Sequence, residues 1–145
     1  MPLQNIGRTT RFTTKTATFT GAAGAGAVGT VALFTVTGEV NIIAIIPFCT
    51  TLLTEAGATA TISLGVTSSG ALFIANTNAV DIDANEFWVD STPDANGIAV
   101  PAALKDIIVT DNIIATVGTQ NVNAGVIRFD VVWEPLSGDG NVVAA

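Results

Sequence analysis

Ala58-Thr59-Ala60-Thr61-Ile62-Ser63-Leu64-Gly65-Val66 is the stretch that decides the fold class, because apolar and polar residues alternate in it with a period of two. This alternation predicts an antiparallel strand with one face in the core and the other toward solvent. The turn Ser68-Ser69-Gly70 and a second strand-like segment over 71–75 follow it directly. We therefore expect a β-hairpin at the centre of the chain.

Segments of similar length and composition lie on both sides of this hairpin and read as further strands. They cover residues 28–37, 39–48, 86–90, 104–110, 113–117 and 126–133. Asp111-Asn112 is expected to be a tight turn between two of them, and residues 50–56 are the one helix candidate, of one or two turns. Eight or nine strands in all predict an all-β fold, an antiparallel β-sandwich that is jelly-roll-like, with a barrel as the alternative.

The segment 39–48 carries apolar residues on both of its faces. Ile42, Ala44 and Ile46 alternate with Ile43 and Ile45. Such a pattern is typical of a strand that is covered on both sides, either in the middle of a sheet or beneath a neighbouring subunit.

Residues 1–29 differ from the rest of the chain in composition. They contain three of the five basic residues, Arg8, Arg11 and Lys15, and the first acidic residue is Glu39. A threonine-rich stretch precedes the small, uncharged residues 21–27, which are typical of a linker. We expect an extended N-terminal arm and linker over residues 1–29 and a β-sandwich domain over 30–145. A short edge strand followed by a loose turn is the alternative for residues 1–29.

The composition argues against several classes of function. The chain has no histidine or tyrosine and one cysteine, so most side chains that transfer protons or attack as nucleophiles at neutral pH are missing. We expect no enzyme and no cofactor. Net charge −7 predicts repulsion from nucleic acids and anionic membranes. Only 12% of the residues are charged, which favours a surface that is partly covered by partners.

The acidic stretch Asp81, Asp83, Glu86, Asp90 and Asp94 is the strongest candidate for a ligand site. Carboxylates at this spacing could gather Ca²⁺, and the first positions start like an EF-hand loop. Glu86 stands where that loop requires glycine and Thr92 stands where it requires a bidentate acid. A solvated acidic loop is therefore the preferred interpretation, and no metal ligand is assigned.

Two further stretches carry a resemblance to a known group of proteins. They are residues 80–94, with Glu86-Phe87-Trp88-Val89-Asp90 at their centre, and residues 125–142, where a strand runs into Trp133-Glu134-Pro135-Leu136-Ser137. Together with the hairpin from Ala58, they resemble small β-rich virion structural proteins of tailed bacteriophages, of the head decoration or cement type. The resemblance covers about residues 30–143 and supplies no catalytic residue.

The resemblance implies a capsid decoration (cement) protein that is made in the host cytoplasm, resides in the virion and stabilises the head shell. Its implied partners are copies of itself, most simply in a homotrimer, and the major capsid protein or another virion protein. The alternative is a receptor- or glycan-binding module of a tail or fibre. Interface residues are expected among two sets, the basic Arg8, Arg11 and Lys15 and the apolar Ile43, Ile45, Trp88 and Trp133.

Overall fold

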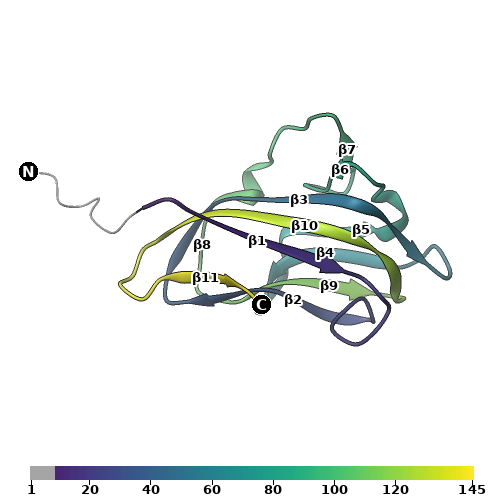
Figure 1. Ribbon diagram of the computed structural model, residues 1–145, viewed down its shortest axis with the longest axis horizontal. Coiled ribbons are helices and arrows are strands. Elements are labelled where there is room, and N and C mark those ends of the chain that lie inside the picture. The colour runs from purple at the N-terminus through teal and green to yellow at the C-terminus, as the bar shows by residue number, and fades with distance from the viewer. Residues whose placement is uncertain (1–8) are drawn as a thin grey trace, which may run out of the picture.

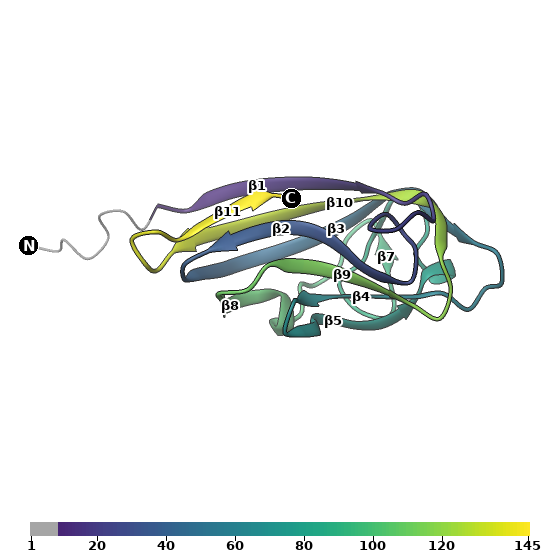
Figure 2. The ribbon, with the colours of Figure 1, turned by 90° about the horizontal axis from the view of Figure 1, so that it is seen from below.

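Two antiparallel β-sheets stacked face to face form the molecule, as the computed structural model shows for residues 9–145 (Figures 1 and 2). The first sheet contains β1 (Arg11–Thr18), β10 (Val122–Pro135), β3 (Val40–Glu55), β6 (Glu86–Phe87) and β7 (Asp94–Ala95), with β8 (Lys105–Val109) also paired to β3. The second sheet contains, in order, β11 (Asn141–Ala144), β2 (Gly29–Thr37), β9 (Ile113–Gly118), β4 (Thr61–Val66) and β5 (Ser69–Asn78). Two short 3₁₀ turns, η1 (Ala79–Asp81) and η2 (Ala102–Leu104), complete the described elements.

The strand order is that of a jelly roll. Eight strands form the two facing sheets, in the orders β1-β10-β3-β8 and β2-β9-β4-β5. Successive strands mostly lie in opposite sheets, so the chain wraps around the core as a double Greek key does. The all-β sandwich predicted from the sequence is confirmed. Because the strands divide into two separate sheets, the barrel alternative does not apply.

The alternating stretch around β4 behaves as expected. The side chains of Ala60, Ile62, Leu64 and Val66 are buried in the core. Ser63 points to the opposite face and is buried as well. Its hydroxyl donates a hydrogen bond to the carbonyl of Gly70 on β5 at 2.9 Å, which offsets the cost of burying it. The hairpin of β4 and β5 is confirmed, although two register shifts make β5 an irregular edge strand.

Two local expectations were wrong. The helix candidate over residues 50–56 does not form, because residues 50–55 continue β3. Asp111-Asn112 does not close a hairpin, because β8 pairs with β3 whereas β9 pairs with β2 and β4 in the other sheet. The side chains of this connection accept hydrogen bonds from the backbone: Asn112 from the Val36 N–H of β2, and Asp111 from the Ser68 N–H in the turn between β4 and β5. Among residues 9–145 the eight strands of the facing sheets are joined by three short ones, β6, β7 and β11.

β1 is the edge strand of the first sheet. It pairs with β10 over its whole length, from Arg11 opposite Trp133 to Thr18 opposite Val126. The glycine-rich residues after it form a turn in which Gly21, Gly24 and Gly26 adopt positive φ, a conformation that favours glycine. Residues 11–27 thus form an edge strand and a turn. The division into an arm and linker over residues 1–29 and a β-sandwich domain over 30–145 stays a prediction. No helix of the described residues is long and apolar enough to cross a membrane.

Candidate interaction surfaces

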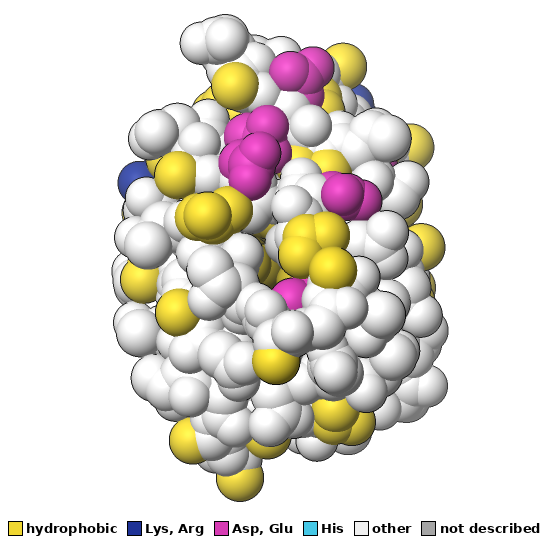
Figure 3. Space-filling view, turned by 90° about the vertical axis from the view of Figure 1, so that its right-hand side faces the viewer, with side chains coloured by type: hydrophobic (Ala, Val, Ile, Leu, Met, Phe, Trp, Pro, Cys, Tyr) yellow, Lys and Arg dark blue, Asp and Glu magenta, His cyan; other side chains and the backbone are white. Residues whose placement is uncertain are grey.

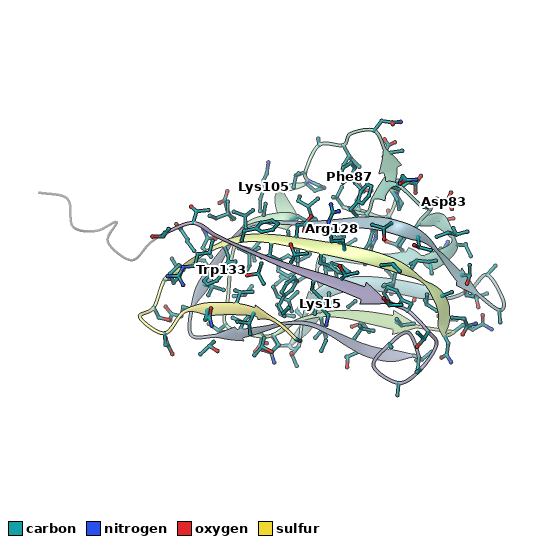
Figure 4. All side chains as sticks on the ribbon, in the orientation of Figure 1. Lys15, Asp83, Phe87, Lys105, Arg128 and Trp133 are labelled. Carbon is teal, nitrogen blue, oxygen red and sulfur yellow. The ribbon has the colours of Figure 1, made fainter. Side chains whose placement is uncertain are left out.

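The seven interface residues predicted from the sequence fall into three groups. Arg8 lies outside the described residues. Arg11 and Lys15 lie on β1, and Ile43, Ile45, Trp88 and Trp133 lie on or beside the strands of the first sheet (Figure 4 labels Lys15 and Trp133). Their positions relative to the core differ. Their role at an interface stays a prediction.

Arg11 and Trp133 form a contact within the chain. The guanidinium carbon of Arg11 lies 5.4 Å from the centre of the Trp133 ring, a distance at which a cation is attracted to the aromatic face. Trp133 is buried, and its indole N–H donates to the Thr13 hydroxyl at 2.9 Å. The Thr13 hydroxyl in turn donates to the carbonyl of Val142 on β11 at 3.0 Å. This chain of hydrogen bonds joins the two sheets along the edge where β1 and β11 meet.

Lys15 lies at the same edge. Its ammonium group donates to the main-chain oxygen of Ala145, just beyond β11. Arg11 and Lys15 are therefore both engaged with neighbouring parts of the chain.

A β-bulge decides how Ile43 and Ile45 point. Trp133 pairs with Ile42 and Val132 pairs with Ala44, so Ile43 is the extra residue. A bulge shifts the alternation of side chains by one residue. Ile42 and Ile45 consequently both enter the core and are fully buried, whereas Ile43 is half-buried on the outer face. Of the two, only Ile43 is placed where a partner could reach it.

Trp88 belongs to the core. It is 0% exposed, and its ring meets the ring of Phe129 edge to face, with centroids 6.5 Å apart. Its indole N–H donates to the buried hydroxyl of Thr77 at 2.9 Å. Trp88 therefore attaches the segment that follows β6 to the interior of the sandwich.

The outer face of the first sheet carries an apolar band in which Ile43 is the one residue predicted from the sequence. Phe12 pairs with Val132, which pairs with Ala44, so these residues share the outer face with Ile43. Ile108 extends the same face on β8, opposite Asn41. Phe12 and Ile108 are the most exposed large apolar side chains of the described residues, at 65% and 66%. We define the apolar band as Phe12, Ile43, Val132 and Ile108.

A second feature of the outer face is the excursion formed by residues 79–104, which we call the acidic excursion. It carries Asp81, Asp83, Glu86, Asp90 and Asp94 and no basic residue. Figure 3 shows carboxylates gathered in the upper part of this end of the molecule, with basic side chains visible only at its margins. No group of three or more carboxylates and thiols that could hold a metal ion occurs among residues 9–145.

The carboxylates of the acidic excursion that form hydrogen bonds bind nearby backbone. Glu86 accepts from the N–H of Asp83 at 3.0 Å, and Asp90 accepts from both the N–H and the hydroxyl of Thr92. Asp81, Asp83 and Asp94 are exposed. The segment is thus a solvated acidic surface whose shape is set by local turns.

An apolar cavity of about 250 Å³ lies between the acidic excursion and the outer face of β3. Ile46 of β3 forms one wall, and the others are formed by Phe87, Val89, Gly97, Ile98 and Val100. Asp94 pairs directly with Phe87, which places its carboxylate beside the cavity. Phe48 contacts Phe87, with ring centres 4.9 Å apart, and the guanidinium carbon of Arg128 lies 5.3 Å from the centre of the Phe48 ring (Figure 4 labels Phe87 and Arg128). We call this hollow the β3 cavity.

The single cysteine, Cys49, lies beneath the acidic excursion. Burial, together with the nearby charges of Glu86 and Asp83, raises the pKa of its thiol to about 11, although a hydrogen bond with the Thr51 backbone partly offsets this rise. Its side chain is fully buried. A buried thiol of this kind is a poor nucleophile, because the thiolate is the reactive form.

We expect the raised pKa of Cys49 to make stability fall at high pH. Above pH 9 the unfolded chain releases the thiol proton while the folded chain keeps it, so the stabilisation present at neutral pH is lost between about pH 9 and 11. The loss should amount to about 2–3 kcal/mol of unfolding free energy. Urea unfolding at pH 8 and pH 10.5 measures it, with Cys49→Ala as the control. An equal loss in the variant would contradict the assignment to Cys49.

Comparisons with known proteins give one informative result. No known family description matches this chain, and no curated protein matches it. Among solved structures, a chain of the "Cyanophage Pam1 capsid asymmetric unit" is similar, with a TM-score of 0.54 and 14% sequence identity. The similarity covers 92% of this chain and 90% of that chain. At this identity the similarity concerns the fold, which is therefore shared over nearly the whole length of both chains.

Proposed function

We propose that this chain is a structural component of a bacteriophage virion, most simply a capsid decoration (cement) protein that binds and stabilises the head shell. The observation that carries the proposal is the fold, which is similar over 92% of this chain to a chain of a phage capsid structure. Jelly rolls serve many functions, so the surface has to support the proposal as well. The low fraction of charged residues and the apolar band provide that support.

We propose that the chain acts by binding and not by catalysis. It contains no histidine or tyrosine, and its one cysteine, Cys49, is buried with a raised pKa. We propose that the apolar band docks on the head shell, because Phe12 and Ile108 are strongly exposed and lie on the same face of the sheet as half-buried Ile43 and Val132. Burial of this surface is favourable by about 25 cal/mol per Å² before the cost of association is subtracted.

Binding to isolated heads tests the proposal. Purified chain is added to phage heads from which it has been removed, and bound protein is quantified after sedimentation. We expect saturable binding with hundreds of copies per head. Binding to host cells or to a glycan panel instead of heads would favour the tail or fibre alternative and would contradict the proposal.

A further inference from the structure

We propose that the β3 cavity receives the N-terminal segment of a second copy of this chain, with Ile6 entering the cavity and Arg8 pairing with Asp94. The inference deepens the proposed structural role, since it supplies a direct link between copies. The segment is residues 1–8, Met1-Pro2-Leu3-Gln4-Asn5-Ile6-Gly7-Arg8. Four observations on charge, shape, reach and competing sites lead to it.

The first observation is charge complementarity. Residues 1–38 carry three basic residues and no acidic residue, whereas the acidic excursion carries five carboxylates and no basic residue. Arg11 and Lys15 are engaged with Trp133 and Ala145 on their own chain. Arg8, the third basic residue of this region, lies outside the described residues, and we propose it as the partner of the acidic excursion. Opposite charges on two surfaces steer association and fix its register.

The second observation is the shape and chemistry of the cavity. Its walls are apolar side chains apart from Gly97, and a cavity of about 250 Å³ exceeds the size at which apolar cavities bind a benzene-sized group. Asp94 lies at its rim, exposed and paired across the strands with Phe87. In an extended segment, residues two apart point the same way. Ile6 and Arg8 could therefore reach the cavity and its rim together.

The third observation is the distance that the N-terminal segment can span. This distance decides whether the segment in the cavity belongs to the same chain or to another copy. Thr16, Arg128, Phe48 and Phe87 lie in one row across the sheet. Thr9 precedes Thr16 by seven residues along the strand direction, and three strand spacings separate β1 from β6. These spacings place Phe87 about 27 Å from Thr9. Ile6 can lie at most about 10 Å from Thr9.

The occupant must therefore come from a neighbour. Figure 1 shows the same separation, with β1 starting at the left end and β6 and β7 rising toward the right. A contact between different surfaces of two copies is head-to-tail, and such contacts close into rings such as a trimer when the rotation permits.

The fourth observation excludes the edge strand β5 as a competing place for a second copy. β5 carries no charged residue, which would suit strand addition. Its two register shifts relative to β4 distort the edge, and such bulges are a usual means of preventing edge-to-edge pairing. The β3 cavity is the better-formed receptor.

Disulfide trapping between two full-length variants tests the proposal. One population carries Ile6→Cys and the other carries Ile98→Cys, on the wall of the cavity. Cys49 is retained in both because its buried thiol reacts slowly. After mild oxidation of the mixture, non-reducing gel electrophoresis measures the cross-linked product. We expect at least tenfold more product than from the matched control pair Ile6→Cys and Val143→Cys, since Val143 is exposed on the other sheet.

Two further substitutions test the proposed ion pair between Arg8 and Asp94. Adding Arg8→Glu to the first chain, or Asp94→Asn to the second, should reduce the product severalfold, and so should raising the salt concentration. Equal cross-linking at Ile98→Cys and Val143→Cys would overturn the proposal, as would cross-linking at neither. The cross-linking experiment contains no phage heads, so a negative result would not contradict binding of the chain to heads. Equally, a chain that does not bind heads could still give the cross-linked product.

Discussion

Replacing Trp88 by alanine is expected to lower the free energy of unfolding by about 3–5 kcal/mol. The indole is 0% exposed and packs edge to face on Phe129. Its removal leaves a cavity between the sheets and deprives the buried Thr77 hydroxyl of its donor at 2.9 Å. Urea unfolding followed by far-UV circular dichroism measures the change.

Two control variants separate the Trp88 effect from general damage. Trp88→Phe retains most of the packing and loses the hydrogen bond, so its cost should be smaller than that of alanine. Phe12→Ala removes an aromatic ring that is 65% exposed and should change stability by less than about 0.5 kcal/mol. A cost below about 1 kcal/mol for Trp88→Ala would contradict the placement of this residue in the core. If the alanine variant does not fold, the free energies of unfolding of Trp88→Phe and Phe12→Ala still test the placement, because Trp88→Phe should be the less stable of the two.

The double substitution Phe12→Asp and Ile108→Asp is expected to abolish binding to phage heads while leaving the fold intact. Both side chains protrude from the outer face of the first sheet, so their loss removes apolar area at the proposed contact and adds two charges there. Central interface residues commonly contribute 1–2 kcal/mol or more each, and every 1.4 kcal/mol corresponds to a factor of ten. We expect affinity to fall at least a hundredfold in the sedimentation assay.

The matched control for the apolar band lies on the opposite sheet. Val143→Asp adds a charge at an apolar side chain that is 46% exposed on β11. We expect this variant to bind heads as the natural chain does. Undiminished binding by the double variant, with unchanged circular dichroism, would remove the apolar band from the mechanism.

The fold was largely predictable from the sequence because alternation of apolar and polar residues is a local signal. Residues 58–66 predict β4 and its inward face, and residues 126–133 predict most of β10. The bulge at Ile43 was not predictable, because an extra residue becomes visible only when the partner strand is known. The expectation that Asp111-Asn112 forms a tight turn between paired strands was wrong for the same reason. Its turn chemistry is local, whereas the assignment of β8 and β9 to different sheets depends on distant strands.

The candidate surfaces were less predictable than the fold. Large apolar residues in strands are expected to face the core, and Ile45, Trp88 and Trp133 do so. Phe12 and Ile108 look the same in the sequence but lie on the outer face. The acidic excursion was visible as a run of carboxylates. The cavity beneath it depends on Ile98 and Val100, which belong to no strand and carry no periodic signal.

Copy number and location in intact particles test the central claim most directly. Quantitative gel densitometry of purified virions gives the copy number, and electron microscopy with an antibody against this chain gives its position. A shell component should be present in hundreds of copies distributed over the head. Absence from particles, or a handful of copies at the tail tip, would contradict the assignment of this chain to the head shell.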